Sequence, residues 1–125
     1  MPRLTTRSID LNRVVITGMG TVNPMGNDVT TTWNGLLKGV SAVTPIERFP
    51  VDDYPVRFAG QVTGFDPSNV IDKKEVRRLD LYLQYALVAA EEAMLDASFE
   101  VAEEEAERVG VLIGSGITEI GRAHV

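Results

Sequence analysis

The stretch that decides the fold is "DKKEVRRLDLYLQYALVAAEEAML", which runs from Asp72 to Leu95. Its first residue and Glu75 stand at the spacing of a helix capping box, although Asp rather than Ser or Thr occupies the first position. The stretch contains neither glycine nor proline, the residues that most often interrupt helices. The pattern therefore predicts one long helix over residues 72–95.

The second half of this stretch is almost entirely apolar. Between Leu81 and Ala90 only Gln84 is polar. A helix that is apolar around nearly its whole circumference must be buried on several sides, because no single neighbour can cover it. We therefore expect this helix to lie inside a layered α/β protein.

The segments around the long helix support the same fold class. "RVVITGMG" (13–20) and "RVGVLIGSGI" (108–117) each predict a buried strand that ends in a glycine turn. Residues 28–39 predict a helix, with Asp28 as its N-cap and Gly39 as its C-terminal stop. Two further segments follow: the proline-rich residues 41–56 predict an irregular excursion, and residues 57–65 predict a short strand broken by Gly60.

Composition excludes several classes of function. With 44% hydrophobic and 24% charged side chains, 125 residues suit one globular domain. The net charge of −6 argues against general binding to nucleic acid or anionic membranes. The absence of cysteine excludes disulfides and a cysteine nucleophile within these residues. The chain has no secretory signal and no apolar stretch long enough for a membrane span, so we expect a cytoplasmic location.

The acidic run at 103–107 predicts a solvated loop or short helix.

The turn Gly18-Met19-Gly20 has the spacing of the first two glycines of a dinucleotide-binding loop. The fingerprint requires a third glycine where this chain has Asn23, and the acidic residue expected after a second strand is missing. The match is incomplete. We therefore expect no nucleotide, no metal and no other cofactor.

Basic residues gather at the start of the long predicted helix. Lys74, Arg77 and Arg78 are spaced i, i+3 and i+4, which places them on one exposed helical face. Cations are disfavoured at a helix N-terminus, so a binding role would explain them there. The alternative is a solvated helix end, balanced by Asp72, Glu75 and Asp80.

Several motifs together resemble one enzyme family. The motifs occur in one order along the chain: "RVVITGMGTVNPMGN", "W-x-x-L-L-x-G-x-S", "RFAGQVTGFD", "KKEVRRLDLYLQYALVAAEEAM" and "RVGVLIGSGI". From about Arg13 to Ile117 the sequence resembles the start of a β-ketoacyl-[acyl carrier protein] synthase II. Pro24, Gly26 and Trp33 resemble type II rather than type I enzymes.

The resemblance implies the N-terminal part of a thiolase-like layered α/β/α/β/α fold, with residues 13–118 belonging to the synthase domain. It implies a homodimeric condensing enzyme of fatty-acid synthesis, which joins acyl-carrier protein to malonyl-carrier protein in a decarboxylative Claisen condensation. In such enzymes a cysteine carries the acyl chain, and two histidines and a lysine assist. None of these catalytic residues can be assigned here, because in the family they lie beyond the point where this chain ends.

Two features can be carried over residue by residue. Lys74, Arg77 and Arg78 match positions that bind the acidic acyl carrier protein in such enzymes. Ile117, in "GSGI", matches a residue at the acyl-chain pocket near the dimer interface. We therefore expect acyl carrier protein as partner of the basic cluster.

The sequence departs from the family at both ends. Residues 1–12 are longer than the usual start, and we expect a flexible leader there. Residues 119–125, "EIGRAHV", differ from the glycines that the family has next. The codons GAG ATC GGA AGA GCA CAC GTC would encode them, and these coincide with a common sequencing adapter, so we expect a non-native tail after Thr118.

We therefore expect part of a synthase II that is inactive alone. Three alternatives stay open. A dinucleotide-binding domain, the class that the first glycine turn suggests, would be stabilised by NAD(P). A non-catalytic partner similar to a chain-length factor would keep the carrier-protein face without the cysteine. A small carrier-protein-binding module would fold independently at this length.

Overall fold

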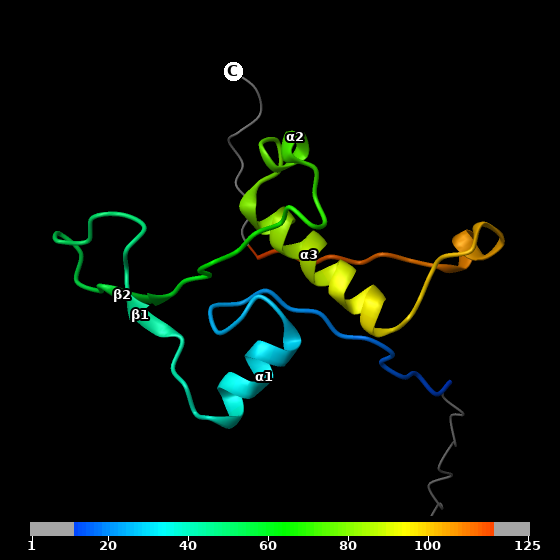
Figure 1. Cartoon of the computed structure of the whole chain (residues 1–125), viewed down its shortest axis with the longest axis horizontal. Helices are drawn as coiled ribbons and strands as arrows, with labels where there is room; N and C mark the ends of the chain where they lie inside the picture. Colours follow the sequence, from blue (N-terminus) through cyan, green and yellow to red (C-terminus); the bar gives the residue numbers. More distant parts are fainter. Residues whose placement is uncertain (1–11, 117–125) are drawn as a thin grey trace, which may run out of the picture.

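A computed structural model describes residues 12–116 of the chain. Helix α3 (Leu81–Asp96) is the longest element and lies at the centre of the molecule (Figure 1). The other elements are short: α1 (Val29–Leu37), β1 (Val43–Pro45), β2 (Phe58–Gly60), α2 (Lys73–Val76) and the 3-10 helix η1 (Glu103–Arg108). Helix α1 and the strand pair lie to one side of α3 in this view, and η1 lies on the other.

The long helix expected over 72–95 is divided into two, so that prediction is wrong. Helix α2 ends at Val76, and α3 begins at Leu81 after a turn. Gln84 explains the break, because its Nε2 donates to the carbonyl oxygen of Val76 at 3.0 Å and to that of Leu79 at 2.9 Å. The side chain thus satisfies carbonyls that a continuous helix would have bonded through backbone N–H groups. Asp72, the expected cap, makes no capping hydrogen bond.

Helix α1 forms where the sequence predicted it. The side chain of Asp28 accepts a hydrogen bond from the Thr31 backbone N–H at 2.6 Å, as expected of an N-cap. Gly39 follows the helix with a φ of +65°, a conformation that favours glycine. The local signals at both ends of this helix are therefore confirmed.

Strands β1 and β2 form a two-stranded antiparallel sheet, in which Val43 pairs with Gly60 and Pro45 with Phe58. A short strand broken by Gly60 was predicted over residues 57–65, and β2 forms only as far as that glycine. Strand β1 was not predicted, because the prolines around it suggested only irregular backbone. Pro45 is tolerated because it lies at the end of an edge strand.

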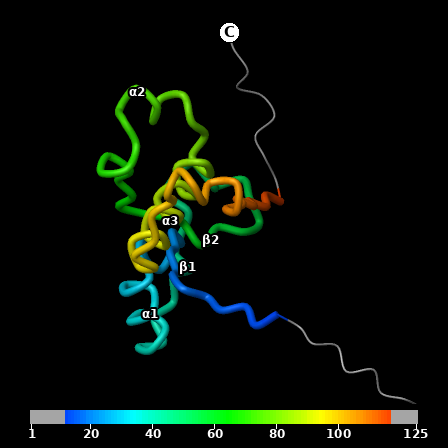
Figure 2. The backbone as a smooth tube through the Cα atoms, turned by 90° about the vertical axis from the view of Figure 1, so that its right-hand side faces the viewer, coloured from blue at the N-terminus to red at the C-terminus, as the bar shows by residue number. Residues whose placement is uncertain are grey.

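The two apolar runs predicted as buried strands are extended but form no strand among residues 12–116. Val14 and Ile16 are 88% and 84% exposed, and Leu112 is 98% exposed. Figure 2 shows both segments running along the outside of the molecule. A strand requires a neighbour for its backbone hydrogen bonds, and the described residues provide none for either run.

Burial is sparse throughout the described part of the chain. Ile71 is its one buried apolar side chain, and Gln84 its one buried polar side chain. The expected burial of α3 is therefore not met here, since Leu81 and Leu87 are each more than 40% exposed. The acidic run forms the exposed helix η1, in agreement with the sequence. Among the described helices, none is long and apolar enough to cross a membrane.

Candidate functional site

The first glycine turn lies directly against α3. A Cβ atom added to Gly18 would collide with the carbonyl oxygen of Ala93, and one added to Gly20 would collide with that of Ala89. Both glycines are therefore needed for close approach of two backbones. This requirement accounts for the turn without any phosphate ligand.

Two backbone donors in and next to this turn bond carboxylates of α3. The Met19 N–H donates to Asp96 Oδ2 at 2.9 Å, and the Thr21 N–H donates to Glu92 Oε2 at 2.8 Å. A pyrophosphate would need these donors, and it would be repelled by the two carboxylates that occupy them. The two hydrogen bonds join the turn to α3.

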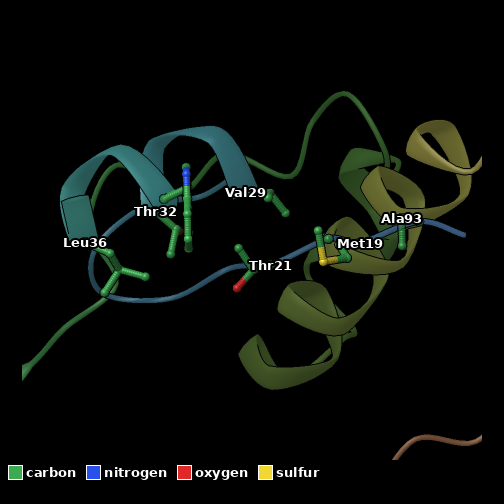
Figure 3. Close-up of a pocket in the computed structure, with 9 residues that line it drawn as sticks. Met19, Thr21, Val29, Thr32, Leu36 and Ala93 are labelled. Carbon is green, nitrogen blue, oxygen red and sulfur yellow. The ribbon is translucent and has the colours of Figure 1, made fainter. Parts of the chain in front are cut away.

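An apolar cavity of about 640 Å³ opens beside this joint, between α1 and α3 (Figure 3). Met19, Thr21 and Val29 line it together with Leu36 and Ala93, which belong to different helices. It contains no cationic side chain and no cluster of acid and base groups. Its chemistry suits packing against apolar groups rather than a reaction.

The basic cluster lies around α2, away from α1 (Figure 1). Only Lys74 lies within that helix, since Arg77 is its C-terminal cap residue and Arg78 follows in the turn. The expectation of a single helical face near a helix N-terminus is therefore corrected, because the helix ends between these residues. All three side chains are nevertheless exposed within a few residues of one another.

The charges of this cluster are only partly balanced. Arg78 forms an ion pair with Glu75 at 3.2 Å, and their side chains are 76% and 50% exposed. Among the described residues, Lys74 and Arg77 form no ion pair. An exposed pair contributes only about 0–1 kcal/mol, so Arg78 can exchange its partner at little cost. Within residues 12–116, the turn therefore presents two cations without an ion pair and a third whose ion pair is easily replaced.

A small cavity of about 290 Å³ adjoins the cluster, lined by Asp66, Ser68, Lys73 and Arg77 among others. The Ser68 backbone N–H donates to Asp66 Oδ1 at 2.9 Å, and the Ser68 side chain also bonds this carboxylate, which together lower the pKa of Asp66. Nearby Lys73 lowers it further. The rim of the cluster thus carries one stable negative charge among its cations.

The cluster is supported by the best-anchored part of the molecule. The two buried side chains described above, Ile71 and Gln84, flank it in sequence. Phe65 packs edge-to-face on Tyr85 of α3, with ring centroids 4.7 Å apart. The turn therefore has packed side chains on both sides of it in the sequence.

Lys74, Arg77 and Arg78 are all exposed around the end of α2, and their role in carrier-protein binding stays a prediction. Ile117 lies outside the described residues, as do residues 1–11 of the expected leader and the expected tail at 119–125. The sequence reasoning missed the structural roles of Glu92, Asp96 and Gln84. The sequence does draw attention to Gln84, because it is the only polar residue between Leu81 and Ala90.

The class of protein follows from comparison with known families. Residues 11–124 match the family described as "Beta-ketoacyl synthase, N-terminal domain". The chain belongs to the β-ketoacyl synthase family, as its motifs predicted. The solved structure of "The ishigamide ketosynthase/chain length factor" is similar with a TM-score of 0.62 and 31% identity, over 69% of this chain and 21% of that chain. The α/β, thiolase-like fold class is thereby confirmed.

Among curated relatives, 3-oxoacyl-[acyl-carrier-protein] synthase 2 of Staphylococcus aureus (strain COL) is 52% identical over 105 residues, or 84% of this chain. The enzyme of the same name from Vibrio cholerae serotype O1 is 48% identical over 105 residues, again 84% of the chain. The chain spans about a quarter of the length of these relatives, since the alignments cover 25% of each.

Proposed function

We propose that this chain forms the N-terminal part of a 3-oxoacyl-[acyl carrier protein] synthase II. Such an enzyme elongates fatty acids by decarboxylative condensation of acyl-carrier protein with malonyl-carrier protein. The observation that carries the proposal is the 52% identity to a synthase 2 over 84% of the chain. The assembled enzyme would be a cytoplasmic homodimer.

The part of this function that lies within the described residues is docking of acyl carrier protein. The exposed cations Lys74, Arg77 and Arg78 form the contact surface for the carrier protein. A carboxylate of this acidic partner would replace Glu75 as the ion-pair partner of Arg78, because the existing pair is exposed. Ile117 would line the acyl-chain pocket. The carrier protein is recognised by charge, so its affinity should fall steeply with ionic strength.

The chemical step requires residues that this sequence does not contain, above all a cysteine. We therefore expect no condensation by the 125-residue chain alone. Purified chain is incubated with acyl- and radiolabelled malonyl-carrier protein. Formation of a labelled 3-oxoacyl product would contradict the proposal.

The docking role is tested in a hybrid synthase, in which this chain replaces the matching quarter of the Staphylococcus aureus enzyme. Lys74→Glu combined with Arg77→Glu reverses two charges of the cluster. We expect carrier-protein affinity at low salt to fall by roughly tenfold or more, because two charge-assisted contacts become repulsive. Isothermal titration with the acyl carrier protein measures this.

The matched control reverses two exposed cations elsewhere, Lys38→Glu with Arg108→Glu, and changes the net charge equally. Affinity should change less than about twofold if position matters rather than total charge. Equal weakening by both double variants, or no weakening by Lys74→Glu with Arg77→Glu, would refute a specific docking surface.

A non-catalytic partner subunit is the second candidate, favoured by the similarity to a ketosynthase/chain length factor structure. It would use the same docking surface but would not restore condensation. A hybrid synthase with normal activity would favour the catalytic assignment, because this segment would then support catalysis in its own context. A third possibility is an independently folding module. It has little support, because residues 12–116 contain one buried apolar side chain, whereas a stable domain needs a buried core.

A further inference from the structure

The side chain of Gln84 is 8% exposed, the one buried polar side chain among residues 12–116. Its amide Nε2 donates to two backbone carbonyl oxygens, Val76 O at 3.0 Å and Leu79 O at 2.9 Å. An amide nitrogen has two N–H groups, so both of its donors are used. The residue is thus fully engaged with the turn that precedes its own helix.

The two accepting carbonyls bracket the arginines of the basic cluster. Val76 immediately precedes Arg77, and Leu79 immediately follows Arg78. Within the described part of the chain, no backbone N–H outside regular helix or strand bonding donates to either carbonyl. The Arg78 and Leu79 N–H groups both donate to Glu75 O, at 2.8 and 2.9 Å. Gln84 therefore completes the bonding that defines the backbone of this turn.

We propose that Gln84 is a positioning residue for carrier-protein recognition, because it holds the turn that presents Arg77 and Arg78. This inference rests on the docking function proposed above. A turn fixed before binding loses less conformational entropy when the partner arrives, and its cations meet the partner's carboxylates in one geometry. The arginines supply the charge, whereas Gln84 supplies their placement.

Gln84→Met tests this in the hybrid synthase, since methionine keeps the length of the side chain but lacks both N–H donors. We expect carrier-protein affinity to fall about fivefold to tenfold, the factor that corresponds to one net hydrogen bond. Hydrogen exchange of the Arg78 and Leu79 amides should become faster. Gln61→Met is the matched control, because Gln61 also donates to a backbone carbonyl, Pro45 O at 2.9 Å, but in the β1–β2 region. It should leave affinity unchanged.

Repeating Gln84→Met in the double variant Arg77→Gln with Arg78→Gln distinguishes positioning of the arginines from a merely structural role of Gln84. If Gln84 acts through these arginines, Gln84→Met should change the affinity of that variant less than about twofold. Equal weakening in both backgrounds would overturn the inference. If Gln84→Met does not fold, Gln84→Asn replaces it, since asparagine keeps the amide but is too short to reach both carbonyls, and the same two comparisons apply.

The outcomes also separate this inference from the docking function. If Lys74→Glu with Arg77→Glu leaves affinity intact, the docking function itself fails. If that variant weakens binding but Gln84→Met does not, docking stands and the positioning role is wrong.

Discussion

The carboxylate of Glu92, in α3, accepts a hydrogen bond from the backbone N–H of Val29 at 2.7 Å, although 63 positions separate the two residues. Val29 is the first residue of α1, where N–H groups lack helical partners and the macrodipole favours an anion. The other oxygen of Glu92 accepts from the Thr21 N–H. One carboxylate thus joins three segments of the chain.

Replacement of Glu92 by alanine should therefore be costly. It removes two hydrogen bonds to a charged acceptor, each of which contributes about 1.5–3 kcal/mol when partly buried. We expect a loss of about 3–6 kcal/mol in the hybrid synthase, measured by the shift in its denaturant midpoint. The adjacent Glu91→Ala is the control, because exposed Glu91 makes no hydrogen bond among those described. If both variants lose the same stability, Glu92 is not the joint inferred here.

Gly20→Ala should destabilise the same joint by a different cause. The new Cβ would meet the Ala89 carbonyl oxygen, which belongs to helix backbone and cannot rotate away. We expect a loss of more than about 3 kcal/mol or failure to fold. Gly110→Ala has open space around it and no positive φ, so it should be neutral or stabilise by about 0.4–1 kcal/mol. A folded Gly20→Ala with unchanged thermal midpoint would contradict the close approach.

The cap of α1 should be sensitive to acid. The Thr31 backbone N–H and then its side chain lower the pKa of Asp28 below its ordinary value of 3.8. Because the folded pKa is the lower one, the stabilisation is complete above 3.8 and is lost as pH falls through the folded value. The Thr31 amide shift, followed by NMR, should titrate below pH 3.8. Asp28→Asn should abolish this titration, whereas Asp66→Asn should leave it unchanged.

The exposed apolar runs should make the 125-residue chain self-associate. Val14, Ile16, Val111 and Leu112 are each more than 80% exposed on extended backbone, which is a template for strand pairing between copies. We expect concentration-dependent light scattering and binding of a hydrophobic dye. Ile16→Lys combined with Leu112→Lys should reduce both. A monomeric chain with a cooperative melt and no dye binding would show that these runs are covered.

The sequence predicted those features that depend on residues close together along the chain. The cap at Asp28 and the stop at Gly39 were predicted because each depends on neighbours within a few residues. The cluster of Lys74, Arg77 and Arg78 was also found from sequence. Its helical setting is not predicted, because the capping-box spacing at Asp72 predicts the start of one continuous helix, whereas α2 ends at Val76.

The apolar runs at 13–20 and 108–117 show a second limit. Their composition indicates buried strands, but a strand exists only where another strand accepts its hydrogen bonds. Within residues 12–116 no such neighbour is present, and both runs are exposed.

By itself the sequence determined the family, the short elements with local caps and the identity of the basic residues. The structure decided where the helix predicted over 72–95 breaks, between Val76 and Leu81, where Gln84 hydrogen-bonds two backbone carbonyls. It also decided why Gly18 and Gly20 must be glycine, since α3 passes directly against them. Local signals act through backbone geometry over a few residues, whereas the need for these two glycines depends on a contact between segments that the chain brings together only on folding.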